Sequence, residues 1–177
     1  MKINLFKHTH FLIVLLLFMM FSMLVTAQNQ GNGNSVSITA SANVIGADID
    51  FQTIADMGII DAQRTQEGSV LYINPVFDPQ AGIMLARGNP GAQIRVSYLS
   101  EMVIERREGE GTITFNYEIS GFEGDNQRES ELLDQIEREL RFNDKGEFYF
   151  YIGGTVDLSN ALPGNYDGEF TMEIEYM

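Results

Sequence analysis

PGNYDGEFTMEIEYM, residues 163–177, is the stretch that decides the fold. It opens with a Pro-Gly pair, which is typical of a tight turn. Apolar residues then occupy every second position, at Phe170, Met172, Ile174 and Tyr176, with Thr or Glu between them. Because neighbouring side chains of a β-strand point to opposite faces, this alternation predicts a strand with one buried face and one face in water.

The same alternation recurs along the rest of the chain at short spacing. Its clearest runs are 35–42, 94–98 and 112–119, while residues 148–152 are apolar on both faces and suit a central strand. Clusters of Gly, Pro and Asn separate these runs, as expected of turns. Eight or more short strands with such turns predict an all-β domain, either an antiparallel β-sandwich or a barrel.

One segment departs from the strand pattern. Residues 127–140 contain no Gly or Pro, and they place Leu133, Ile136 and Leu140 at helical spacing. Asn126 stands where a helix N-cap would be. We therefore expect one short helix inserted between strands, either packed over one end of the sandwich or docking a partner.

The beginning of the chain has the composition of a secretory signal. Lys2 and Lys7 precede an apolar run over residues 11–24, and small residues lead to Ala27. We expect cleavage after Ala27, a secreted or cell-surface location, and no membrane span in the remaining chain. The predicted layout is a signal peptide (1–27), a flexible polar leader (28–34) and a single β-sandwich domain (35–177).

The composition excludes several classes of function. All 25 acidic residues and nine of the 11 basic residues follow position 27, so this part of the chain has a net charge of −16 and should repel nucleic acid. Both histidines precede position 27, and the chain has no Cys or Trp. His-dependent and Cys-dependent catalytic triads and His/Cys zinc sites are therefore excluded from the domain. No acidic cluster has EF-hand spacing, and no pair of carboxylates is singled out for glycoside hydrolysis. We expect no enzyme activity, no cofactor and no metal site.

Two tyrosines form the candidate ligand face. Tyr149 and Tyr151 alternate with Phe148 and Phe150, so both hydroxyl-bearing rings would point to one side of a strand. An exposed pair of this kind could bind a glycan. The other interpretation is a central strand that buries both of its faces.

Several blocks together resemble the family catalogued as domain of unknown function 4402, secreted proteins of Gram-negative bacteria. These blocks are ITASANVI (38–45), NPGA followed by IRVSY (89–92, 94–98), YIGGTV (151–156) and PGNYDGEF (163–170). The resemblance implies an immunoglobulin- or pilin-like β-sandwich. It implies no established activity, and it carries over no catalytic residue.

The end of the chain is also similar to chaperone–usher pilins, with Gly164 and Tyr176 at corresponding positions. In pilins an incomplete sandwich accepts a strand from its neighbour. The donor strand here would carry Val36, Ile38, Ala40 and Ala42. The chain departs from pilins because it has no cysteines for a disulfide and has a short leader. We expect a non-catalytic structural subunit that contacts copies of itself or other surface proteins. The alternative is a surface binding module of the adhesin type, for a glycan or a protein partner.

Overall fold

The computed structural model describes residues 34–44, 49–62, 70–133 and 139–177, and all of these belong to one compact unit, Asn32–Met177. The predicted signal peptide, and the predicted leader as far as residue 33, lie outside the described residues. No helix within the described residues is long and apolar enough to cross a membrane.

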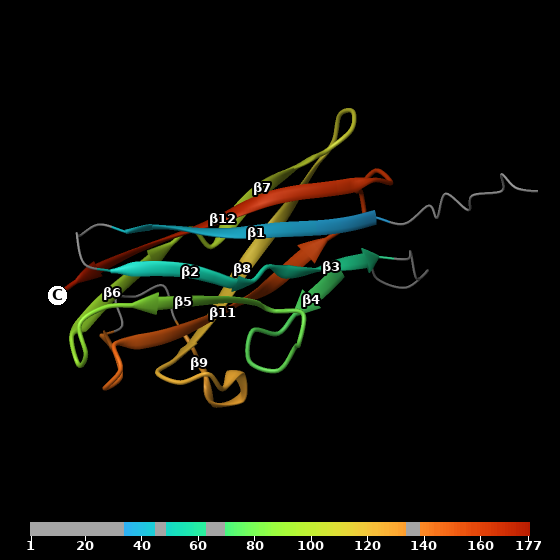
Figure 1. The fold of residues 1–177 in the computed structure, drawn as a ribbon. Coiled ribbons are helices and arrows are strands. Elements are labelled where there is room, and N and C mark those ends of the chain that lie inside the picture. The colour runs from blue at the N-terminus through green and yellow to red at the C-terminus, as the bar shows by residue number, and fades with distance from the viewer. Residues whose placement is uncertain (1–33, 45–48, 63–69, 134–138) are drawn as a thin grey trace, which may run out of the picture. The chain divides into compact units, whose positions relative to one another are not determined.

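Strands make up nearly the whole of the described fold (Figure 1), which confirms the all-β prediction. The elements follow in the order β1 (Asn34–Val44), β2 (Asp50–Ala55), β3 (Met57–Ala62), β4 (Val70–Ile73), β5 (Gly82–Arg87), β6 (Gln93–Tyr98), β7 (Glu101–Arg106), β8 (Thr112–Phe122), the 3-10 turn η1 (Gln127–Glu129), β9 (Glu131–Leu132), β10 (Leu140–Arg141), β11 (Glu147–Asp157) and β12 (Asn165–Tyr176).

The strand predicted from the closing stretch, β12, has partners on both edges. Along one edge lies β1, parallel to it and in register over residues 165–174 of β12. Along the other edge, β7 pairs with residues 166–167 and β6 with residues 172–176, both antiparallel. Among the strand pairs described, β1 with β12 is the only parallel one, so the first and last strands of the described fold run side by side (Figure 1).

The hydrogen-bonded path through the strands returns to the ribbon on which it starts. Only Asp56 separates β2 from β3, so the two form one ribbon with a break. β3 pairs with β1, whereas β2 pairs with β5. The path β3–β1–β12–β7–β8–β11–β5–β2 therefore begins and ends on the same ribbon. Within the described residues, β1 is the only strand that joins β12 to this ribbon.

One apolar cluster fills the space that these strands enclose. Phe170, Met172 and Ile174 are at most 1% exposed, whereas Thr171 and Glu173 between them are exposed. This is the alternation predicted for the closing stretch. A strand with one face in the core and one in water needs this pattern, because a shift of one residue would turn the apolar set outward.

The expected helix over residues 127–140 is corrected by the structure. Its described residues form a single 3-10 turn, η1, followed by the short strands β9 and β10, while 134–138 lie outside the described residues. β9 pairs with the end of β8, and β10 pairs with β6. Leu132 at the end of β9 is half-exposed, and Leu133, which follows it, is buried. Pairing with an existing sheet edge prevails here over local helical spacing.

Candidate functional site

The four predicted donor residues all lie on β1, which occupies a slot between β12 and β3. One edge of β1 is bonded to β12 over ten residues, and the other edge is bonded to β3 near residues 34–38. Ile38 is 1% exposed and belongs to the core cluster, while the neighbouring Thr39 faces water. β1 therefore completes the hydrogen-bond ladder and also supplies part of the core.

Charge distinguishes β1 from the strand beside it. None of its eleven residues, NSVSITASANV, is charged. β12 carries exposed carboxylates at Asp167, Glu169 and Glu173. In the parallel register Thr39 stands opposite Glu169. Since like charges that face each other across a sheet destabilise it, the slot beside β12 favours an uncharged or basic strand.

Gly164 and Tyr176, the other two predicted assembly residues, lie at opposite ends of β12. At Gly164 the backbone has φ +150, and an added Cβ would stand 2.5 Å from Nε of Arg106, so this position needs glycine. The hydroxyl of Tyr176 accepts a hydrogen bond from the backbone N–H of Asn89 at 2.9 Å. The structure does not bring the two residues together; each instead fixes one end of the strand that borders the slot.

A second tyrosine of β12 was not identified from the sequence. Tyr166 is 1% exposed, and its hydroxyl donates a hydrogen bond to the backbone carbonyl of Leu162 at 2.8 Å. A tyrosine at the start of a strand that bonds back to the chain a few residues upstream is the tyrosine corner of β-sandwiches. The signal was present in LPGNY, residues 162–166, where a turn sequence leads directly into the tyrosine.

The structure separates the two tyrosines of the candidate ligand face by their exposure. Tyr149 is partly exposed, whereas Tyr151 is 1% exposed. Burial raises the pKa of Tyr151 to about 12, and the negative charge of Asp125 adds to this. Among the described residues its hydroxyl makes no hydrogen bond of ordinary geometry. An aromatic platform needs both rings at the surface, and in this structure only Tyr149 reaches it.

A comparison with protein families agrees with the fold and with the blocks noted in the sequence. The model of a family described as a domain of unknown function, DUF4402, matches residues 25–176. The chain belongs to the DUF4402 family. Among curated proteins, no sequence matches it. The description of the DUF4402 family assigns no activity, so functional inference rests on the chain's own residues.

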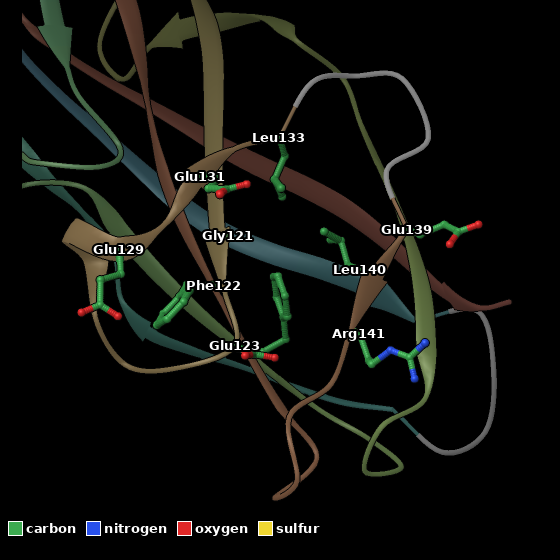
Figure 2. A pocket seen from close by; sticks show the side chains of 10 residues that line it. Gly121, Phe122, Glu123, Glu129, Glu131, Leu133, Glu139, Leu140 and Arg141 are labelled. Atoms are coloured by element: carbon green, nitrogen blue, oxygen red, sulfur yellow. The ribbon is translucent and has the colours of Figure 1, made fainter.

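One hollow in the DUF4402 chain combines an apolar floor with an acidic rim (Figure 2). Its volume is about 260 Å³. Leu133 and Leu140 face into it (Figure 2), and Phe148 also belongs to its lining. The rest of the lining comprises Gly121 and Phe122, the glutamates Glu123, Glu129, Glu131 and Glu139, and Arg141. Residues 134–138, which follow Leu133, lie outside the described residues.

Two of the rim glutamates accept hydrogen bonds from side-chain amides. Asn126 donates to Glu129 at 2.8 Å, and Gln93 donates to Glu139 at 3.4 Å. Among the described residues, no group of three or more His, Cys, Asp or Glu side chains could hold a metal ion.

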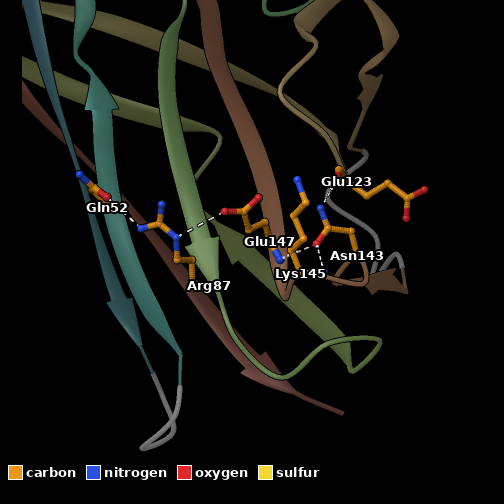
Figure 3. A network of polar contacts seen from close by, with 6 residues as sticks. All are labelled: Gln52, Arg87, Glu123, Asn143, Lys145 and Glu147. Atoms are coloured by element: carbon orange, nitrogen blue, oxygen red, sulfur yellow. Dashed lines mark hydrogen bonds and ion pairs between the residues drawn. The ribbon is translucent and has the colours of Figure 1, made fainter.

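A polar network in the DUF4402 chain holds the turn between β10 and β11 (Figure 3). The side-chain oxygen of Asn143 accepts hydrogen bonds from the backbone N–H groups of Lys145 and Glu147, both at 2.9 Å. Its amide nitrogen donates to the carbonyl of Glu123 at 2.6 Å. Nearby, Arg87 lies 3.6 Å from the Glu147 carboxylate. These contacts fix a turn against the end of β8, which gives them a structural role.

Proposed function

We propose that this DUF4402 protein is a non-catalytic structural subunit, exported to the cell surface or beyond, which contacts copies of itself or other surface proteins. The observation that carries the proposal is the position of β1. In the part of the chain that the structure describes, β1 is the first strand and the only one that joins β12 to the β2–β3 ribbon, and such a strand is the part of a sandwich that another chain can supply.

The energetic argument concerns what an empty slot would expose. Removing β1 would leave one edge of β12 and one edge of β3 with unpaired N–H and C=O groups. Such edges are templates for pairing with another chain. Removal would also uncover the core beside Ile38, which is 1% exposed in the complete fold. A subunit without a bound β1 would therefore bind an eleven-residue strand with the right pattern.

The sequence supports the export part of the proposal. The n-region lysines, the apolar run and the small residues before position 28 form a secretory signal. Cell fractionation with an antibody against the domain tests this part. We expect a chain that begins at Gln28 in the extracellular or surface fraction. An unprocessed chain confined to the cytoplasm would contradict it.

A strand-replacement experiment tests the structural part. We compare the chain beginning at Gln28 with the same chain lacking residues 28–44. The shortened chain should lose cooperative unfolding, and a peptide of residues 34–44 should restore it. The matched control is the same peptide with Ile38→Asp, which puts a charge into the core and should restore nothing. If the shortened chain is as stable as the longer one, β1 is not needed to complete the fold, and the proposal based on its position fails.

The alternative is a surface binding module of the adhesin type. The hollow lined by Leu133, Leu140 and the acidic rim favours it, because sites for small ligands combine an apolar floor with a few polar groups. A glycan array, with pull-down from surface extracts, tests this alternative. Binding that is lost in a Glu139→Lys variant, at an exposed rim position, but kept in an Ile38→Ala variant would favour the module over the assembling subunit.

A further inference from the structure

We infer that the partner is a second copy of this chain, and that two copies exchange β1 in the same parallel register beside β12. This inference rests on the proposed function and names its partner. It follows from three properties of β1. The strand has no charged residue, it comes first among the described strands, and it would make the same contacts in its own copy as in a second copy.

Charge selects β1 over the other strands of the chain. Among the described strands of six residues or more, only β1 has no charged residue. The slot places its occupant beside the carboxylates of Glu169 and Glu173, and beside Asp167, whose carboxylate is paired with Arg107. A strand bearing Asp or Glu at the facing positions would meet like charge, whereas Thr39 meets Glu169 without repulsion.

Connectivity makes β1 the strand that can move. Its C-terminal end leads to β2 through residues 45–49, and no described strand precedes it. β12, by contrast, is paired with β6 and β7 on the edge away from β1. A β1 strand seated in another copy makes the same backbone bonds to β12 and the same core contact through Ile38. Exchange of an identical element between copies therefore costs no contacts.

The absence of cysteine allows a direct test of where β1 is seated. In a chain beginning at Gln28, Thr39→Cys and Glu169→Cys are introduced together, because these positions are opposite each other in the register. A disulfide within one chain gives a monomer, whereas exchange gives a covalent dimer. We refold the chain over a hundredfold range of concentration, oxidise it and separate the products on a denaturing gel.

The fraction of covalent dimer should rise from a trace at the lowest protein concentration to the main product at the highest. The control is Val103→Cys with Thr114→Cys, on β7 and β8, which face each other in a pair that exchange of β1 leaves intact. This control should stay monomeric at every concentration. A Thr39/Glu169 pair that gives only monomer throughout would overturn the exchange, while the export and strand-replacement results would still decide the proposed function.

A charge-pairing experiment provides a second, independent readout. One variant carries Thr39→Glu opposite the native Glu169, and the other carries Thr39→Lys with Glu169→Lys. Each variant alone places like charges opposite each other at positions 39 and 169. In a mixed dimer that has exchanged β1, each β1 strand instead brings position 39 opposite the other variant's position 169, which gives two Glu–Lys pairs. We expect heterodimers five- to thirtyfold in excess over homodimers by native mass spectrometry after joint refolding. A statistical mixture, or monomers alone, would overturn the inference.

Discussion

Two buried tyrosines offer a matched measurement of what a single hydrogen bond contributes to this sandwich. Tyr166 and Tyr151 are each 1% exposed, and both lie on long strands. The Tyr166 hydroxyl donates to the carbonyl of Leu162 at 2.8 Å. The Tyr151 hydroxyl makes no comparable hydrogen bond among the described residues, and the Asn126 backbone beside it only partly offsets the effect of burial on its pKa. Replacing either with Phe removes one oxygen and keeps the buried ring, so the variants differ only in the lost bond.

The magnitudes follow from that difference. Tyr166→Phe removes a made bond and leaves the Leu162 carbonyl short of a partner, so it should lower the free energy of unfolding by about 1–2 kcal/mol. Tyr151→Phe removes a buried polar group that gains little from the fold. It should leave the free energy unchanged or raise it by up to about 1 kcal/mol. The two substitutions should thus act in opposite directions or differ by about 2 kcal/mol.

Urea unfolding, followed by tyrosine fluorescence and by circular dichroism, measures the change in the free energy of unfolding for both variants. With a slope of about 1.5 kcal/mol/M, the unfolding midpoint of Tyr166→Phe should fall by about 1 M. The midpoint of Tyr151→Phe should stay level or rise. Equal falls in the two variants, or a larger fall for Tyr151→Phe, would refute the reasoning, because the cost would then come from ring packing and not from the hydrogen bond.

Three further predictions concern pH, backbone conformation and a turn. The pKa of Tyr151 is raised to about 12 from an ordinary value of about 10, so the folded state binds this proton more tightly than the unfolded state does. The free energy of unfolding should therefore fall as the pH rises from about 10 to about 12. Alkaline unfolding curves measure this fall, which should be smaller in Tyr151→Phe. Gly154→Ala should lower the free energy of unfolding in urea by at least about 3 kcal/mol, because φ is +144 and the new Cβ would stand 2.1 Å from the Asn116 carbonyl oxygen. Gly91→Ala, with φ +72 and open space around the new Cβ, should lower it by about 1 kcal/mol. Equal losses in the two variants would contradict the steric argument. Asn143→Ala removes three hydrogen bonds at the β10–β11 turn and should cost about 2 kcal/mol by thermal unfolding, whereas no measurable loss would assign the turn's stability to its backbone alone.

The sequence predicted what depends on local pattern and failed where distant parts of the chain compete. The alternation of apolar and polar residues was sufficient to predict β12 as a strand, because every second side chain enters the core, as the burial of Phe170 and Ile174 confirms. The helix over 127–140 was wrong because its apolar spacing fits a helix as well as two short strands. Only the neighbouring edges of β8 and β6 decide between them.

The candidate site shows the same division. Alternation identified β1 as a strand with small apolar residues, but nothing local indicates that β12 lies beside it. That pairing joins residues about 130 positions apart in the chain, and its parallel direction leaves no hairpin signal. The exposure of Tyr149 and Tyr151 was undecided for a related reason. A strand that is apolar on both faces can be covered on either, and only the packed fold shows that Tyr151 is covered.

The long separation between β1 and β12 also bears on when exchange would happen. Loop-closure entropy opposes pairing between distant segments until the intervening strands have formed, and the parallel partner of β1 is the last of the described strands. The slot needs β12 and β3 in place, because β1 pairs with both of them. At that moment the chain's own β1, tethered through β2, competes with the β1 of any neighbouring copy for the same bonds. Since the bonds are identical, local concentration decides the outcome. A surface where many copies fold close together would favour exchange, and a dilute solution would favour the closed single chain.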